Sequence, residues 1–375
     1  MREIHSLAEF DAQIATHGNL DDVVIQGLDL CDRTDAIIAA SCTGTTFLGA
    51  ALTDAALRHV HETGAIVFPR FDDLPFDPYR PCLYGQRELL DGWLPGDTSG
   101  LHTFEQSLDT RIYRWASQYE RGTHLPVVHA LARRLHDHAI DDALRDHLDS
   151  QPRVVAVMGG HGLTRDDTTY RTVAELGWML ASNGYHVATG GGPGAMEAAN
   201  LGAWLSRRSA TAVDDAITML SPAVDFADTD GYLTAGLEVC DTFTDGGESL
   251  AVPTWFYGHE PTNQFATHVA KYFANSIRED GLLAIASHGV VFAPGSAGTV
   301  QEIFQDATQN HYGVFGQASP MVLLGSDYWN DVLPAEQLLR DLAAGRVYSD
   351  MITTVDSADE ALRWIVGHPP QTVQT

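Results

Sequence analysis

From residue 153 onward, short apolar runs alternate with amphipathic stretches, and this alternation constrains the fold more than any other feature of the chain. Apolar runs without polar alternation predict strands that are buried on both faces, as in a parallel sheet covered by helices. We therefore predict an α/β fold, a Rossmann-like doubly wound parallel sheet in three αβα layers. The expected strands are 153–160, 186–192, 249–256, 289–293, 321–325 and 351–356, and the expected helices are 170–185, 194–206, 262–280 and 299–311.

The first 150 residues differ in character from the rest. Residues 71–85 are rich in proline and aromatic side chains and cannot be regular structure throughout. Residues 20–68 are compatible with short strands and a helix, whereas 125–148 has the spacing of a long amphipathic helix. No internal repeat stands out. We predict a smaller N-terminal accessory domain at 1–95, a helical bridge at 96–150 and a main domain at 151–370.

Composition excludes several classes of partner. A formal net charge of -28 argues against binding to nucleic acid or to an anionic membrane, since both favour Lys and Arg. The first residues lack the apolar core of a signal peptide, so a cytoplasmic location is expected. The four cysteines are scattered, and His138, Asp141 and Asp142 are better explained as a solvated helix face than as metal ligands. We expect neither a metal nor another cofactor.

A glycine-rich segment, "TGGGPGAME" at 189–197, follows the second expected strand. Glycines at 190, 191, 192 and 194 let backbone N–H groups approach an anion, and the next helix directs its positive end to the same place. The segment is neither a dinucleotide fingerprint nor a P-loop. A tight turn without ligand is the alternative, but four glycines in five positions exceed what a turn needs. Phosphate binding by Gly190, Gly191, Gly192 and Gly194 is therefore favoured.

A second turn, "PGSAGTVQE" at 294–302, joins an apolar run to an expected helix. Its composition suits anion binding, yet Glu302 would lie near the bound anion. A structural explanation competes for the same carboxylate, because Thr299 and Glu302 have the spacing of a capping box. Considered alone, this segment favours the capping box.

The third candidate is the stretch 262–280, which contains Lys271, the sole lysine of the chain. In the expected helix, Lys271, Asn275 and Arg278 share one face because they are spaced i, i+4 and i+7. A solvated charged face is the usual explanation of such a pattern, and the alternative is a ligand-binding face.

Together the two glycine-rich segments resemble a known family. "TGGGPGAMEAANLGA" is similar to the GGGxxGxM segment of the LONELY GUY (LOG) proteins, and "PGSAGTVQE" is similar to their PGGxGTxxE signature, about 100 residues further on. The resemblance covers roughly 150–330 and leaves the N-terminal region outside, as in larger bacterial nucleotide 5'-monophosphate nucleosidases.

The resemblance implies hydrolysis of the N-glycosidic bond of a nucleoside 5'-monophosphate, with an AMP-like purine favoured, and a homodimer or higher homo-oligomer with 262–280 near the interface. Glu302 would be the catalytic carboxylate and Arg278 its partner. The substrate would be bound by Gly190, Gly191, Gly192, Gly194, Met196, Gly295, Ser296, Gly298, Thr299, Lys271 and Asn275. The alternative is a nucleotide-binding or carrier protein that does not catalyse.

Three residues depart from the family pattern. Ser296 replaces the second glycine of PGG, and serine can still donate to a phosphate. Gln301 stands where many members carry a second glutamate, and Glu279 stands where the plant enzymes carry a lysine. The missing lysine argues against cytokinin-type specificity, and Lys271 is a candidate substitute.

Overall fold

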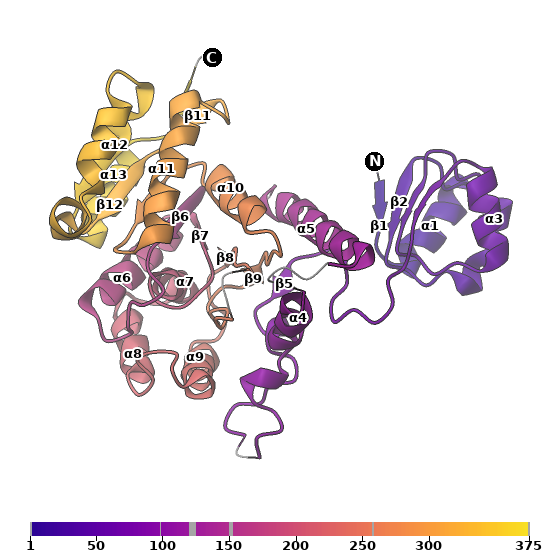
Figure 1. Ribbon diagram of the computed structural model, residues 1–375, viewed down its shortest axis with the longest axis horizontal. Coiled ribbons are helices and arrows are strands. Elements are labelled where there is room, and N and C mark those ends of the chain that lie inside the picture. The colour runs from indigo at the N-terminus through magenta and orange to yellow at the C-terminus, as the bar shows by residue number, and fades with distance from the viewer. Residues whose placement is uncertain (1, 98, 120–124, 150–152, 257–258, 374–375) are drawn as a thin grey trace. The chain divides into compact units, whose positions relative to one another are not determined.

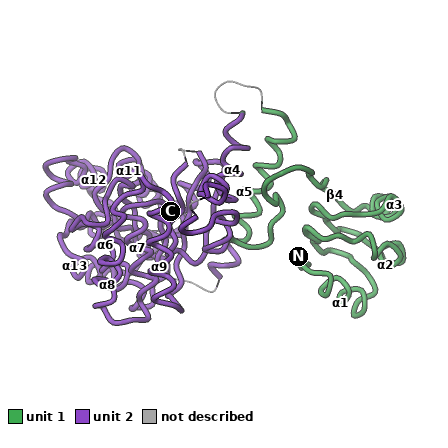
Figure 2. Tube along the Cα trace, turned by 90° about the horizontal axis from the view of Figure 1, so that it is seen from below, with its two compact units in different colours: residues 1–83, 119–144 green, residues 84–118, 145–375 purple. Residues whose placement is uncertain are grey.

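The computed structural model describes residues 2–97, 99–119, 125–149, 153–256 and 259–373. The chain forms two compact units, drawn in separate colours in Figure 2: residues 1–83 with 119–144, and residues 84–118 with 145–375. The division falls inside helix α5 (Val127–Leu148) and not at the expected boundaries near 95 and 150. The roles assigned to the accessory and main domains stay predictions.

The larger unit, shown as a ribbon in Figure 1, is built on an eight-stranded sheet. The order of its strands is β13-β12-β10-β6-β7-β8-β9-β5. Every neighbouring pair is parallel except β5 and β9. The predicted Rossmann-like α/β class is confirmed by this sheet. Its strands are β5 (Tyr84–Gly85), β6 (Val154–Met158), β7 (His186–Thr189), β8 (Ser249–Ala251), β9 (His268–Val269), β10 (Val290–Phe292), β12 (Met321–Leu324) and β13 (Ile352–Val355).

Helices cover both faces of this sheet. Alternate residues of β6 separate the two faces: Val155 and Val157 pack in one core with α6, α7 and α13, while Val154 and Ala156 are buried on the other side. Helices α10, α11 and α12 pack against one another as a second group. The helices of this unit are α4 (Leu108–Ser117), α6 (Thr168–Ser182), α7 (Ala195–Leu205), α8 (Thr211–Leu220), α9 (Thr229–Thr242), α10 (Asn275–Ile285), α11 (Ala297–Tyr312), α12 (Ala335–Ala343) and α13 (Ala358–Gly367).

Shorter elements complete the larger unit. Among the described residues, no helix is both long and apolar enough to span a membrane. The short elements are η2 (Glu88–Leu90), η3 (Phe104–Gln106), η4 (Tyr328–Val332), η5 (Val347–Met351) and the antiparallel pair β11 (Gln317–Ala318) and β14 (Gln371–Thr372).

The strand order reverses direction at β6. From β6 the chain adds β7, β8 and β9 on one side, and then returns to place β10, β12 and β13 on the other. Right-handed connections that run in opposite directions along a sheet place their helices on opposite faces. The loop after β6 and the loop after β10 therefore turn away from each other at this point of the sheet. In such sheets, ligands bind outside the carboxyl ends of the strands at this switch point.

The expected helix at 262–280 is wrong over most of its length. Residues His268 and Val269 form β9, and the ladder to β8 continues through hydrogen bonds from the Ala270 and Tyr272 N–H groups to the carbonyls of Ala251 and Pro253. Helix α10 begins only at Asn275. Sheet pairing with a buried neighbour therefore outweighs the local helical pattern.

The smaller unit contains a second, four-stranded parallel sheet in the simple order β1-β2-β3-β4. Its register pairs Ile4 with Ile25, Ile25 with Phe47 and Phe47 with Val67, so equivalent residues recur about every 21 residues. The strands of this unit are therefore regularly spaced along the chain. The elements are β1 (Arg2–Ile4), α1 (Leu7–His17), β2 (Val23–Gln26), η1 (Cys31–Arg33), α2 (Thr34–Ala39), β3 (Thr46–Leu48), α3 (Asp54–Glu62) and β4 (Ile66–Phe68).

Candidate functional site

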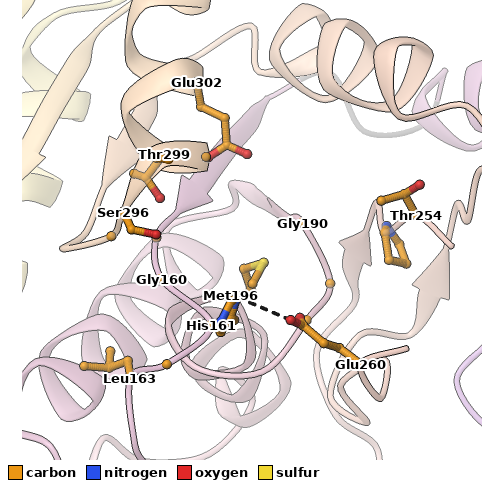
Figure 3. A pocket seen from close by; sticks show the side chains of 18 of the residues that line it. Gly160, His161, Leu163, Gly190, Met196, Thr254, Glu260, Ser296, Thr299 and Glu302 are labelled. Atoms are coloured by element: carbon orange, nitrogen blue, oxygen red, sulfur yellow. Dashed lines mark ion pairs between the residues drawn. The ribbon is translucent and has the colours of Figure 1, made fainter. Parts of the chain in front are cut away.

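A cavity of about 820 Å³ opens at the carboxyl edge of the large sheet, around the switch point (Figure 3). The turns after β6, β7 and β10 all line it. Most of the residues predicted from the sequence also line it: Gly190, Gly191, Gly192, Met196, Lys271, Arg278, Gly295, Ser296, Gly298, Thr299 and Glu302. Gly194 and Asn275 lie outside the cavity lining given by the described residues.

The three turns touch one another at glycines. A Cβ on Gly295 would stand 2.2 Å from Thr299 Oγ1 and 2.9 Å from the Gly160 nitrogen. Gly194 has a φ of +72°, and its Cβ would stand 2.4 Å from the Gly160 carbonyl oxygen. Gly194 is thus needed for close packing between two turns. The glycines of the cavity wall place no side chain between the backbone and the cavity, although the N–H groups of Gly160 and Gly191 already donate to the Pro294 carbonyl and to Thr189 Oγ1.

Helix α11 directs its N-terminus at the cavity. Ala297, Gly298 and Thr299 form its first turn, and all three line the cavity. N–H groups in the first turn of a helix have no intrahelical acceptor, so this end can bind an anion such as a phosphate.

The capping-box explanation of Glu302 is wrong. Helix α11 begins at Ala297, so Thr299 is its third residue and Ser296 holds the N-cap position. No side chain donates or accepts a capping hydrogen bond there within the described part of the chain. Glu302 therefore lies beyond the first turn, and its carboxylate is available to a different partner.

That partner is Arg278 on α10. Its Nη1 lies 3.4 Å from Glu302 Oε1, and the two side chains are 12% and 14% exposed. Burial raises the pKa of Glu302 to about 7, the Arg278 charge opposes the rise, and the nearby Glu279 charge adds to it. A carboxyl group whose pKa is shifted by burial beside a charged partner in a cavity is a candidate functional residue.

Arg278 retains donor capacity toward the cavity. Among the residues that the structure describes, its buried Nε has no hydrogen-bond partner. Its Nη2 lies 3.5 Å from the position of a Cβ on Gly190, so the guanidinium reaches the second glycine turn. The neighbouring Glu279 accepts hydrogen bonds from Asn275 Nδ2 and from Gln301 Nε2, the latter at 2.8 Å. Asn275 therefore contacts Glu279 on the same helix.

Lys271 is not on a helix with Arg278, and the expected shared helix face is wrong. It follows β9 and its side chain is 3% exposed, which also rules out a solvated face. Its Nζ lies 2.8 Å from Asp109 Oδ1 and donates to Thr262 Oγ1 at 3.0 Å. Asp109 comes from α4, 162 residues upstream in sequence, and no motif pointed to it.

A further pair of charged or titratable side chains, which no sequence motif indicated, lines the cavity. His161, in the turn after β6, lies 3.3 Å from Glu260, in the loop between β8 and β9 (Figure 3). Asn263 anchors this loop: its N–H donates to the Gly191 carbonyl, and its Oδ1 accepts from the Phe265 and Ala266 N–H groups. Among the described residues, no group of three or more His, Cys, Asp or Glu could hold a metal ion.

The strand order and the switch-point cavity define a Rossmann-like α/β protein, a class in which ligands bind outside the carboxyl ends of the strands. The model of the SLOG cluster4 family matches residues 152–210, the stretch that contains β6, β7 and the first glycine-rich turn. This match confirms the resemblance to the LOG superfamily that the glycine motifs gave.

Three solved structures show weak likenesses. The molybdenum cofactor binding protein from Rippkaea orientalis is 16% identical, with 58% of this chain and 97% of that chain covered and a TM-score of 0.37. The Moco carrier protein from Chlamydomonas reinhardtii is 17% identical, with 58% of this chain and 99% of that chain covered and a TM-score of 0.35. The structural-genomics target TM1055 is 21% identical, with 57% of this chain and 99% of that chain covered and a TM-score of 0.38. Among curated protein sequences, none matches. Scores this low establish no common fold, so the fold assignment rests on the topology above.

Proposed function

We propose that this protein hydrolyses the N-glycosidic bond of a nucleoside 5'-monophosphate, with an AMP-like purine favoured, and releases the free base and ribose 5-phosphate. The observation that carries the proposal is the Glu302–Arg278 pair, which shares one cavity with the N-terminus of α11 and both glycine turns. A phosphate bound at that helix end leaves the sugar to face the pair.

The chemistry follows from charge. Cleavage of the bond between C1' and the base develops positive charge on C1' and the ring oxygen, and a carboxylate beside the sugar stabilises it. Glu302 takes that role and orients the attacking water. Water supplies a hydroxyl to C1' and a proton to the departing base, so the products balance without any redox step.

A product assay tests the proposal. The wild-type protein is incubated with a panel of purine and pyrimidine 5'-monophosphates and with the matching nucleosides. We expect free base and ribose 5-phosphate from a monophosphate but not from its nucleoside. Glu302→Gln should lower kcat by about a hundredfold or more while the ligand still binds.

A matched control is Asp280→Asn, which changes a carboxylate to an amide on the same helix as Arg278 but outside the cavity lining. It should keep wild-type activity. Absence of base release from every substrate, together with a melting temperature that monophosphates still raise, would replace the hydrolase by a non-catalytic nucleotide-binding or carrier protein.

We also infer a homodimer, from the resemblance alone. Helix α10 (Asn275–Ile285) replaces the longer helix expected at 262–280 as the element near the interface. Light scattering that gives only the monomer mass at micromolar concentration would overturn this inference.

A further inference from the structure

The order of the strands sets the direction in which a nucleotide lies in the cavity. The N-terminus of α11 follows β10 and the first glycine-rich turn follows β7, whereas Lys271 follows β9, which is four strands from β10 and two from β7. With neighbouring strands about 4.8 Å apart, the end of β9 lies roughly 19 Å from the end of β10 and roughly 10 Å from the end of β7. In Figure 3, Ser296 and Thr299 lie on one side of the cavity and Thr254 and Glu260 on the other. A ligand bound through its phosphate at α11 therefore points its base toward β8 and β9.

Lys271 offers a donor at this second end. Within the described part of the chain, its hydrogen bonds go to Asp109 Oδ2 at 2.9 Å and to Thr262 Oγ1 at 3.0 Å, and its Nζ also lies 2.8 Å from Asp109 Oδ1. An ammonium carries three donors, so one remains when a single N–H group serves the Asp109 carboxylate. Lys271 and Thr262 both line the cavity, and the remaining donor can reach a ligand there.

Asp109 fixes the position of that ammonium. Its Oδ1 also accepts a hydrogen bond from Trp255 Nε1 at 2.7 Å, so one buried carboxylate holds both side chains. The next residue, Thr110, contacts His259 Nε2, and the His259 ring is stacked between Phe104 and Tyr113. Helix α4 is thereby attached to the loop that carries Thr262.

A purely structural role explains this pair poorly. Desolvating two charges costs about as much as their attraction returns, and well-packed apolar residues often replace such pairs without loss of stability. The sole lysine of the chain is nevertheless buried in such a pair at the wall of the cavity.

We propose that Lys271 donates a hydrogen bond to an acceptor atom of the nucleobase, and that Asp109 is the positioning residue that aims it. The consequence for catalysis rests on the proposed hydrolase. As the bond to C1' breaks, the base takes the electron pair, and the Lys271 ammonium stabilises that charge. The ammonium keeps its proton, and the proton that completes the base comes from water.

Affinity for purine analogues tests this without relying on turnover. Calorimetry compares AMP with 1-deaza-, 3-deaza- and 7-deaza-AMP, each of which lacks one ring acceptor, in the Glu302→Gln background. We expect one analogue to bind at least about tenfold more weakly than AMP, as for loss of a hydrogen bond to a charged group. Equal binding of AMP and all three analogues by the Glu302→Gln protein would overturn the proposal.

The same comparison is made after adding Lys271→Met and Asp109→Asn together, so that no buried charge is left unpaired. The variant should bind AMP and the discriminated analogue equally, while ribose 5-phosphate, which has no base, should bind as before. If the ratio of the dissociation constants for the analogue and for AMP is the same in the variant as before, the proposal is also overturned. Lys271→Arg, which keeps the charge but moves the donor, should lower the ratio and serves if the double variant does not fold.

Asp109→Asn alone separates positioning from folding. It should reduce the ratio between AMP and the analogue without changing ribose 5-phosphate affinity, whereas a merely structural residue would leave the ratio intact. If AMP binds but no base is released, the hydrolase fails and the affinity ratios still test Lys271. If base is released and the ratios do not change, only the Lys271 proposal fails.

Discussion

Arg278 and Glu302 lie on adjacent helices with 3.4 Å between Nη1 and Oε1, and both side chains are largely buried in the wall of one cavity. The pair places a carboxylate with a pKa of about 7 beside a guanidinium whose Nε has no partner among the described residues. A sugar between the phosphate turns and this pair would meet both groups. The pH response of the protein should therefore report on these two residues.

The first prediction concerns activity against pH. In the proposed hydrolysis Glu302 acts as a carboxylate, so kcat/KM should rise with pH and level off above about 7. Arg278 lowers the pKa of Glu302, so Arg278→Gln should move the rising limb to higher pH. Carbon-13 NMR of the Glu302 carboxyl measures the same shift without turnover. If the pH profile of Arg278→Gln rises at the same pH as that of the wild type, Arg278 does not lower the pKa of Glu302.

The second prediction separates ligand binding from folding at the α11 turn. A Cβ on Gly298 would meet nothing within 4 Å, so Gly298→Ala should leave the fold intact and raise stability by up to about 1 kcal/mol. It should nevertheless weaken monophosphate binding, since the methyl group enters the cavity. Gly295→Ala is the contrast, because its Cβ would clash with Thr299 and Gly160 and lower stability as well. Melting curves with and without AMP distinguish the two.

The third prediction concerns Asp306 on α11, a buried carboxyl whose Oδ2 has no hydrogen-bond partner in the described residues. Burial raises its pKa to about 8. The folded state keeps this proton after the unfolded chain has released it, so this group makes stability fall as pH rises from about 4 to about 8. Asp306→Asn removes that loss and should be more stable than wild type by an amount that grows with pH.

The slope of the free energy of unfolding against pH limits the difference in stability between wild type and Asp306→Asn. One protonated group contributes at most about 1.4 kcal/mol per pH unit. Urea unfolding at several pH values measures the free energy of unfolding of both proteins. Parallel stability curves for wild type and Asp306→Asn would show that Asp306 is ionised in the folded state.

The fourth prediction concerns the buried pair Arg165 and Glu197. Arg165 Nε lies 2.7 Å from Glu197 Oε1 and Nη2 lies 3.1 Å from Oε2, with Tyr170 donating to the same carboxylate. Arg165→Met leaves that carboxylate buried and unpaired, so it should cost about 3–5 kcal/mol of stability. Arg165→Met with Glu197→Gln should recover part of the loss. Denaturant midpoints measure both, and equal losses would show that the charge is not the cause.

Much of the large sheet could be predicted from the sequence. Residues 154–158 and 290–292 are strands in the structure because each apolar run is buried on both faces, a property that local composition reveals. The turns at 190–194 and 294–298 were placed at the carboxyl ends of strands for the same reason. Short-range patterns carry this information because burial and helical spacing act over a few residues.

Contacts between distant residues lay beyond such patterns. The capping box between Thr299 and Glu302 gave way to an ion pair with Arg278 because α11 begins two residues earlier than its sequence suggests. Lys271 does not lie on the expected helix, because the segment before it forms β9 and pairs with β8. Its side chain instead forms an ion pair with Asp109 of α4. The sequence alone determined the class of sheet and the position of its glycine turns. Tertiary structure decided which charges meet in the cavity, because partners 24 and 162 residues apart are chosen by packing and not by local propensity.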